Sequence, residues 1–333
     1  MKKNIWIFGG ANVDICGIAH KPLIHKDSNK GTIAFSYGGV GRNIAQAAAL
    51  CSNNNDDINV NLITCISDDD FGHMIKDDCL SLGIDISKSV MVNNKPTSIY
   101  LAVLDDNRDM SLGMSDMRIL DELDEKVIHN VMPLIQEQDI IVVDSNFNLD
   151  LLNIIIKSAP CRIACDPVSV NKMDVLKDVI SSISIFKPNQ IEAEYLTGIK
   201  ITDEDSARAS LKWFLEIGID EVIITLGEAG VLIGVNRGKS VCHNHGPEEG
   251  EYGMLWLKHR ATQMKNATGG GDSLLGAYLV ERLKDQSPCE AAEFAIGCAI
   301  LNIETDAHER HNLTDDVIRA SLSSMNISKN ELT

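Results

Sequence analysis

Short apolar runs alternate with helical patterns along nearly the whole chain, and this alternation limits the possible folds more than any other feature. The candidate strands are residues 4–8, 60–65, 140–144, 162–166, 182–186 and 221–225. Between them lie candidate helices at residues 43–51, 71–82, 123–135, 149–158, 191–196 and 207–216. Near-continuous Val and Ile runs separated by helices indicate a parallel sheet with both faces covered. The sequence therefore predicts a doubly wound α/β fold with a mostly parallel sheet flanked by helices.

Two segments depart from this alternation. Residues 15–40 show no helical period, and residues 99–104 and 110–113 flank a turn-like Asp105-Asp106-Asn107-Arg108, which predicts a β-hairpin. Extra strands outside a parallel sheet can form a flap over the strand ends, where ligands of such sheets bind. We expect one domain over residues 1–333, with a small β lid formed by about residues 15–40 and 97–117. The C-terminal third is expected to be helical at residues 271–283, 289–302 and 314–325.

Acidic residues outnumber basic ones, with 48 Asp and Glu against 30 Lys and Arg and a formal net charge of -18. No stretch gathers the surplus of Lys and Arg that nucleic acid or anionic lipid requires, so we expect neither as a partner. The chain shows no signal peptide and no apolar span of roughly 18 residues, which predicts a cytoplasmic protein. The 9 scattered cysteines indicate buried free thiols rather than a disulfide framework.

The segment Gly269-Gly270-Gly271-Asp272 precedes an apolar-periodic helix and carries the strongest signal for a site. Glycines that enter a helix expose backbone N–H groups at its positive end, which binds anions. A carboxylate repels a bound phosphate, but beside one it can act as a base. Asp272 can then accept the proton of a substrate hydroxyl while the glycine amides stabilise a transferred phosphoryl group. The alternative is a flexible turn in which Asp272 caps the helix.

Asn12 and Asp14 follow the first candidate strand at period-two spacing, so both side chains point the same way from extended backbone. A second glycine-rich turn, Gly38-Gly39-Val40-Gly41-Arg42-Asn43, precedes a helix. A Rossmann dinucleotide site is disfavoured, because G-x-G-x-x-G does not follow the first strand. The amides and carboxylate of Asn12, Asp14 and Asn43 suit the hydroxyls of a vicinal diol. Capping and turn roles are the alternative for each of them.

Two further motifs lie where strands end. Asn189 and Glu192 are three residues apart and share a face of the first helical turn. Glu192 can hold water ligands of Mg²⁺, or it can be a first-turn acid that favours the helix dipole. The turn Thr225-Leu226-Gly227-Glu228-Ala229-Gly230 can border a nucleotide or simply reverse the chain.

Several common catalytic motifs do not occur in the sequence. It contains no G-x-x-x-x-G-K-[ST], no G-x-S-x-G and no H-E-x-x-H. Cys242-His243-Asn244-His245 resembles a metal cluster by composition, but it lacks partners at zinc spacing. The sequence therefore disfavours a P-loop, a nucleophile elbow and a zinc centre.

Together the motifs resemble the PfkB, or ribokinase-like, family of carbohydrate and nucleoside kinases. The resemblance covers nearly the whole chain in the right order, through residues 9–14, 38–43, 189–192, 225–230 and 269–272. Some strings are most similar to family members that act on pseudouridine. These are residues 38–46, Asp27-Ser28-Asn29, Thr97-Ser98-Ile99-Tyr100, Ser115-Asp116-Met117, Asp144-Ser145-Asn146 and Asp166-Pro167-Val168-Ser169.

The resemblance implies ATP-dependent phosphorylation of the ribose 5′-hydroxyl of pseudouridine, with Mg²⁺. It makes Asp272 the catalytic base beside an anion hole of Gly269, Gly270 and Gly271. The implied substrate-binding residues are Asn12, Asp14, Ser28, Gly39, Asn43, Thr97, Asp116, Asn146 and Asp166. The implied nucleotide-binding residues are Lys187, Asn189, Thr225, Gly227 and Gly230, with Glu192 organising the metal. A homodimer through the lid is also implied, because lid strands of such kinases often pair between subunits and a two-stranded lid has an exposed edge.

The sequence departs from the family pattern in two places. The family usually has Asp-Thr-x-Gly-Ala-Gly-Asp, whereas this chain has Asn266-Ala267-Thr268-Gly269-Gly270-Gly271-Asp272. Because the first carboxylate is lost, the sequence does not decide whether the chain has the monovalent-cation site of many family members. Residues 241–260 also form a longer segment than the pattern predicts. Two other functions stay open: a ribokinase-like kinase for another nucleoside or a pentose, and a non-catalytic nucleoside or sugar sensor on this fold.

Overall fold

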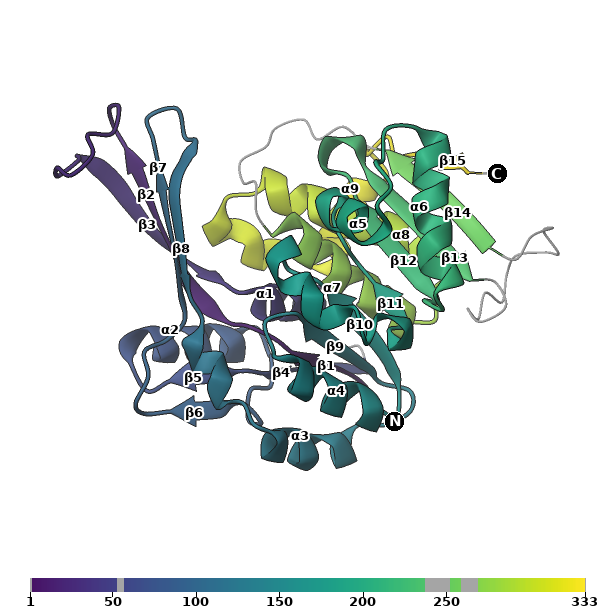
Figure 1. The fold of residues 1–333 in the computed structure, drawn as a ribbon, viewed down its shortest axis with the longest axis horizontal. Helices are drawn as coiled ribbons and strands as arrows, with labels where there is room; N and C mark the ends of the chain where they lie inside the picture. The colour runs from purple at the N-terminus through teal and green to yellow at the C-terminus, as the bar shows by residue number, and fades with distance from the viewer. Residues whose placement is uncertain (1, 53–56, 237–251, 259–268, 333) are drawn as a thin grey trace.

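A computed structural model describes residues 2–52, 57–236, 252–258 and 269–332 (Figure 1). Its main sheet has nine strands in the order β15-β14-β13-β12-β11-β10-β9-β1-β4. In this order, each strand from β12 to β4 is parallel to its neighbour. Strands β13, β14 and β15 are added at the other side of β12 in antiparallel pairs. The strands are β1 (Lys3–Phe8), β4 (Ile58–Ile63), β9 (Ile140–Asp144), β10 (Arg162–Asp166), β11 (Ile185–Phe186), β12 (Glu221–Thr225), β13 (Val231–Asn236), β14 (Tyr252–Lys258) and β15 (Ser328–Glu331). The predicted doubly wound, mostly parallel sheet is confirmed.

Helices cover both faces of this sheet because successive strand residues point to opposite sides. Ile5 and Ile7 of β1 pack in one core, whereas Trp6 and Phe8 pack in the other. The first core contains α1 (Val40–Cys51), α2 (Asp70–Ser81), α7 (Gly270–Leu283), α8 (Pro288–Glu304) and α9 (Asp315–Leu322). The second contains α3 (Glu125–Val131), α4 (Leu149–Ser158), α5 (Gln190–Thr197) and α6 (Glu204–Glu216). Each core is therefore a helical layer on one face of the sheet.

A second sheet stands apart from the main one and is built from the segments that are expected to form a lid (Figure 1). It has four strands in the order β3-β2-β7-β8: β2 (Asn12–Ala19), β3 (Gly31–Gly38), β7 (Ile99–Leu104) and β8 (Met110–Asp116). The predicted hairpin is β7 and β8. The expectation of a two-stranded lid is wrong, because the segment without helical period supplies β2 and β3. We refer to this four-stranded sheet as the lid sheet.

Other departures from the predicted elements have local causes. The last third is not purely helical, since β13 to β15 extend the sheet edge there. The helix expected over residues 123–135 ends early and continues as a 3-10 turn that contains Pro133, which cannot donate a helical hydrogen bond. Short elements complete the fold: β5 (Cys65–Ser67), β6 (Val90–Val92) and the 3-10 turns η1 (Arg118–Glu122), η2 (Met132–Leu134), η3 (Val170–Leu176), η4 (Ile180–Ser182), η5 (Gly227–Ala229) and η6 (Ala307–Asn312).

The structure also bears on the thiols and on membrane spans. The cysteines that it describes are all free thiols. None of the described helices is long and apolar enough to cross a membrane. Cys242 lies outside the described residues.

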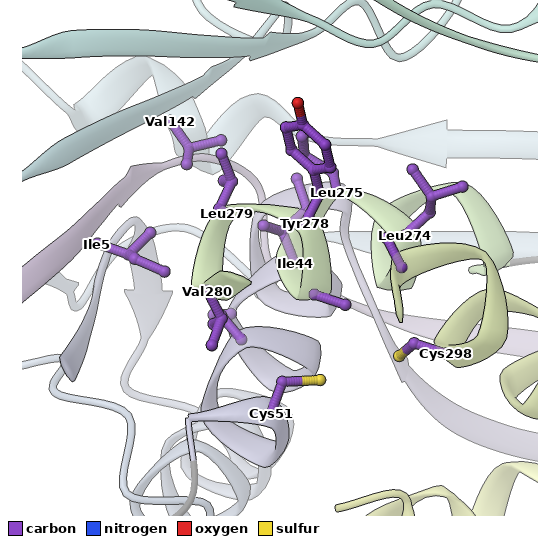
Figure 2. Packing of buried hydrophobic residues seen from close by; sticks show 14 of the residues in the cluster. Ile5, Ile44, Cys51, Val142, Leu274, Leu275, Tyr278, Leu279, Val280 and Cys298 are labelled. Carbon is purple, nitrogen blue, oxygen red and sulfur yellow. The ribbon is translucent and has the colours of Figure 1, made fainter. Parts of the chain in front are cut away.

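Helix α7 packs very closely on α1, and Gly276 permits the contact. In Figure 2, side chains of α7 such as Leu275 and Leu279 lie among residues of the sheet and α1. A Cβ atom at Gly276 would lie 2.5 Å from the carbonyl oxygen of Ile44, which belongs to the rigid helical backbone. We therefore expect Gly276→Ala to lower the free energy of unfolding by about 1 to 3 kcal/mol. Alanine's helix propensity, better by about 1 kcal/mol, offsets only part of the clash.

Urea denaturation of the two proteins measures this difference. Gly17→Ala is the matched control, because a Cβ at Gly17 meets no atom within 4 Å. Equal stability of the parent and Gly276→Ala would show that the two helices can separate at no cost.

Candidate active site

A cavity of about 400 Å³ opens between the lid sheet and the carboxyl edge of the parallel strands. Chain segments that leave β1, β9 and β10 form its floor, and the first turn of α7 closes one side. Its lining residues are Gly10, Asn12, Asp14, Ser36, Tyr37, Gly39, Val40, Asn43, Tyr100, Ser115, Met117, Asn146, Val168, Ser169, Lys172, Gly269, Asp272 and Arg310. Ligands of open α/β sheets bind at this edge, so the cavity is the candidate active site.

Asp272 lies in the first turn of α7 and faces the cavity. Its Oδ2 accepts a hydrogen bond of 2.9 Å from Nδ2 of Asn43 on α1. Burial, assisted by the negative charge of Asp166, raises the pKa of Asp272 to about 7, although Lys187 and Asn43 favour the ionised form. A carboxylate with a pKa near neutrality can take up a proton during a reaction and release it afterwards.

The start of α7 has no side-chain cap and lies near two cations. Gly269 has φ 83°, a left-handed conformation, and no side chain caps the helix. A Cβ at Gly271 would lie 3.0 Å from Nζ of Lys187, and one at Gly269 would lie 3.4 Å from Nη1 of Arg310. Uncapped N–H groups, the helix dipole and two nearby cations together favour a phosphate at this position.

Lys187 and Asp166 form a buried ion pair behind the cavity. Their charged atoms are 2.9 Å apart, and each side chain is 5% exposed. Asp166 is not among the residues that line the cavity, although the family resemblance implies that it binds the substrate. Its carboxylate instead neutralises Lys187 and opposes ionisation of Asp272.

Asn12 and Asp14 meet as the sequence predicts. Nδ2 of Asn12 donates a 2.6 Å hydrogen bond to Oδ1 of Asp14, and both side chains line the cavity. Burial raises the pKa of Asp14, while the bond from Asn12 and the charge of Arg42 oppose the rise. Gly39 has φ 95°, and a Cβ there would lie 2.4 Å from the carbonyl oxygen of Gly10. This close approach brings α1, and with it Asn43, to the cavity wall.

The register of the lid sheet decides which lid residues face the cavity. Ser36, Asp14, Tyr100 and Ser115 lie opposite one another across the four strands, and all four line the cavity. Asp116 points to the other face, because successive strand residues alternate. It forms a 2.6 Å ion pair with Arg118.

Two other predicted substrate residues lie outside the cavity lining. Thr97 is buried, and its hydroxyl donates to Asp69 Oδ1 at 2.5 Å. Ser28 is exposed in the turn between β2 and β3. Asn146 does line the cavity, where its Oδ1 accepts a hydrogen bond from Lys172.

Asn189 and Glu192 form a capping box at the start of α5. Asn189 Oδ1 accepts from the Glu192 amide at 2.9 Å, and Glu192 Oε2 accepts from the Asn189 amide at 2.7 Å. Glu192 is 2% exposed, and burial raises its pKa. Glu192 thus has the helix-start role that the sequence allows, and this role engages its Oε2. The described part of the chain contains no group of three or more His, Cys, Asp or Glu residues that could hold a metal ion.

The predicted nucleotide turn lies at the end of β12. Thr225 ends the strand, and Gly227 and Gly230 have φ 59° and 99°. A Cβ at Gly230 would lie 2.1 Å from the carbonyl oxygen of Leu257, so β14 packs directly on the turn. Two features of the sequence lie outside the described residues. They are Asn266, on which the monovalent-cation site depends, and Cys242-His243-Asn244-His245.

Sequence reasoning missed two cations of the cavity, Lys172 and Arg310. Both lie in 3-10 turns without a recognisable motif, so no local signal marks them. Burial lowers the pKa of both side chains. Just before Lys172, Val168 adopts φ 62°, which is rare for a β-branched residue and typical of strain stored at functional sites.

Comparison with known proteins agrees with this arrangement. The model of the pfkB family carbohydrate kinases matches residues 2–309. The chain belongs to this family. It is 30% identical over 307 residues to a pseudouridine kinase of Escherichia coli K12, and the match covers 92% of each chain.

Two solved ribokinases share the fold of this kinase. The enzyme from Thermotoga maritima is 20% identical, with a TM-score of 0.77 and coverage of 97% of this chain and 100% of that one. The enzyme from Arabidopsis thaliana, complexed with ribose and ATP, is 19% identical, with a TM-score of 0.73 and coverage of 97% and 99%. The ribokinase-like fold is therefore confirmed, and the family identifies a phosphotransferase with an alcohol acceptor on a sugar or nucleoside.

The charges around Asp272 lead to a test of its ionisation. We expect Asp166→Asn to lower the titration midpoint of Asp272 from about 7 by about one pH unit, because a nearby negative charge is removed and the carboxylate form becomes more favourable. NMR of ¹³C-labelled aspartate, with the signal assigned by Asp272→Asn, measures the midpoint. Asp174→Asn is the control, since Asp174 pairs with Lys177 at the surface. A midpoint that rises or stays constant in Asp166→Asn would contradict the electrostatic account.

Proposed function

We propose that this kinase transfers the γ-phosphoryl group of ATP to the ribose 5′-hydroxyl of pseudouridine. The observation that carries the proposal is the position of Asp272. It belongs to the uncapped first turn of α7 and lines the same cavity as Asn12 and Asp14, and its pKa is about 7. A base at this junction can serve an acceptor hydroxyl on one side and a phosphoryl group on the other.

In the proposed reaction, Asp14 and Asn12 hold the ribose hydroxyls and Asp272 accepts the 5′-hydroxyl proton. The 5′-oxygen forms a bond to the γ-phosphorus, the bond from that phosphorus to the bridging oxygen of ADP breaks, and ADP leaves with the electron pair. The amides of Gly270 and Gly271 stabilise the transferred group, with Lys187 and Arg310 adding positive charge.

We propose Asp166 and Glu192 as the residues that orient Mg²⁺ through its water ligands. Carboxylate oxygens suit this hard cation, and the two groups are close enough for the charge of Asp166 to raise the pKa of Glu192, after the larger effect of burial. The metal neutralises phosphate charge when it is bound with ATP. The nucleotide itself is assigned to the turn containing Thr225, Gly227 and Gly230.

Polar side chains in the cavity lining support a nucleoside with hydrogen-bonding groups on its base as the substrate. Tyr100 and Ser115 of the lid sheet line the same cavity as Asn146, Ser169 and Lys172. Pseudouridine carries one more ring N–H than uridine, and a polar pocket can offer that donor an acceptor. The 30% identity to a pseudouridine kinase supports the same substrate.

A coupled ATP-consumption assay over pseudouridine, uridine, cytidine, adenosine and ribose tests the proposal. We expect kcat/KM for pseudouridine to exceed that for uridine by about tenfold or more, because a site built around a hydrogen bond rejects the analogue that lacks it. Asp272→Asn, the control, is expected to lower kcat by about a hundredfold or more.

Below a pH of about 7, Asp272 holds a proton and cannot accept another, so the rate should rise as pH increases through this value.

Other outcomes of the assay separate the alternatives. Preference for adenosine or ribose would overturn the substrate but keep the kinase. Tight binding of a nucleoside without ATP consumption would identify a sensor. An unchanged rate in Asp272→Asn would remove this residue from the mechanism.

We also propose that the enzyme is a homodimer joined through the outer face of the lid sheet. The row Phe35, Ile15, Leu101 and Met114 crosses the sheet on the face opposite the cavity. Ile33, Phe35 and Met114 are 67%, 57% and 60% exposed, which is unusual for large apolar side chains on one surface. A second copy of the same face would cover them.

The molar mass in solution tests the dimer. Light scattering coupled to size exclusion should give the mass of two chains for the parent and of one chain for Ile33→Glu, because a buried unpaired carboxylate is costly. Val317→Glu, which changes an exposed residue of α9, is the control and should stay dimeric. A monomeric parent would contradict the proposal.

A further inference from the structure

The amide of Asn43 lies between two groups that allow it only one orientation. Its Oδ1 accepts a 3.2 Å hydrogen bond from Nη1 of Arg42, and its Nδ2 donates at 2.9 Å to Oδ2 of Asp272. A guanidinium has only donors, and an ionised carboxylate has only acceptors. If the amide turned over, its oxygen would face the carboxylate and its nitrogen would face the guanidinium. Both contacts would then be repulsive.

Arg42 is held in place by a buried network. Its side chain is 3% exposed, and its Nη2 lies 2.5 Å from Oδ2 of Asp78 on α2. Nη1 also donates to Gln46 Oε1 at 2.7 Å, and the guanidinium stacks over the ring of Tyr37 at 5.2 Å. A planar fork fixed by several partners presents its remaining N–H group in one direction.

Asp78 connects this network to a third element. Its Oδ1 lies 3.1 Å from Nε2 of His311 on η6, while its Oδ2 pairs with Arg42. The adjacent Arg310 lines the cavity. Asp78 therefore links α1, α2 and η6 around the residue that contacts Asn43.

We propose that Arg42, anchored by Asp78, is a positioning residue that locks the amide of Asn43 so that it donates to Asp272. Without this lock, the amide can turn and present its oxygen to the base, which disfavours the ionised carboxylate. Arg42 thus acts on the reaction through Asn43 and touches neither the substrate nor the phosphoryl group. The inference rests on the proposed role of Asp272 as the base.

Other charged groups also surround Asp272, and the experiment must separate their effects. Asp144 and Asp166 are the last residues of β9 and β10. Lys187 comes directly after β11, and Arg310 belongs to η6. The test removes Arg42 and Asp78 together, in Arg42→Met with Asp78→Asn. The net charge then stays constant, and no buried charge is left without its partner.

The measurement is the ¹³C titration of Asp272 in the full chain without substrate. We expect the paired variant to raise the midpoint by about half a pH unit or more, because the donor from Asn43 is no longer fixed. Asn43→Ala should also raise it. Adding the paired variant to Asn43→Ala should produce no further shift, since residues that act through one another are not additive.

Two results would overturn the proposal. The first is an unchanged midpoint in the paired variant, and the second is an equal shift in the presence and absence of Asn43. Arg319→Met is the matched control, because Arg319 forms a 2.7 Å ion pair with Asp315 on α9. It should change stability and leave the midpoint unchanged.

Arg42→Lys provides the same test if the paired variant does not fold. The single ammonium of lysine can pair with Asp78, but it has no second N–H arm to donate to Asn43. The titration midpoint of Asp272 should therefore rise again, and only when Asn43 is present. Because the titration needs no nucleoside and no ATP, it gives an answer even if the substrate assay finds no activity. Failure of the lock and failure of the proposed function are therefore distinguishable.

Discussion

Burial of helix α7 is the constraint on which the active site depends. Every residue from Ser273 to Leu283 is buried, so the helix is enclosed by α1, α8 and the sheet. In its interior, Tyr278 donates a 2.6 Å hydrogen bond to Glu221, which Arg282 also contacts at 2.7 Å. A helix held along its length cannot tilt at its start. Gly270 and Asp272 therefore stay at the sheet edge, where the strands bring the other polar groups.

The charges at this edge follow from the parallel strands. Asp144 and Asp166 are paired in register at the ends of β9 and β10, and Lys187 follows β11. The buried ammonium of Lys187 lies near the carboxylates of Asp166 and Asp272, whereas Asp144 lies near the charge of Lys172. Burial first, and then the negative charges of Asp166 and Asp144, raise the pKa of Asp272 to about 7. The same geometry that builds the sheet thus prepares the proposed base.

The lid sheet has two chemically different faces because β-strands alternate. Polar residues from four strands face the cavity in one row, and apolar residues face outward in the next. A single sheet can in this way cover a nucleoside on one side and contact a second subunit on the other. In the proposed function, substrate closure and assembly share this one element.

The amino-acid pattern by itself determined the layered fold and the polar motifs at the strand ends. Strands β9, β10 and β12 and helix α4 have the predicted bounds, because apolar runs and local capping act within a few residues. Strand register was decided only by pairing between distant segments. It brought Tyr100 and Ser115 into the cavity and left Asp116 outside its lining. Local patterns also did not predict that Lys172 and Arg310 line the cavity, or that Arg42 contacts Asp78. In each case the neighbouring residues come from elements far apart in the chain.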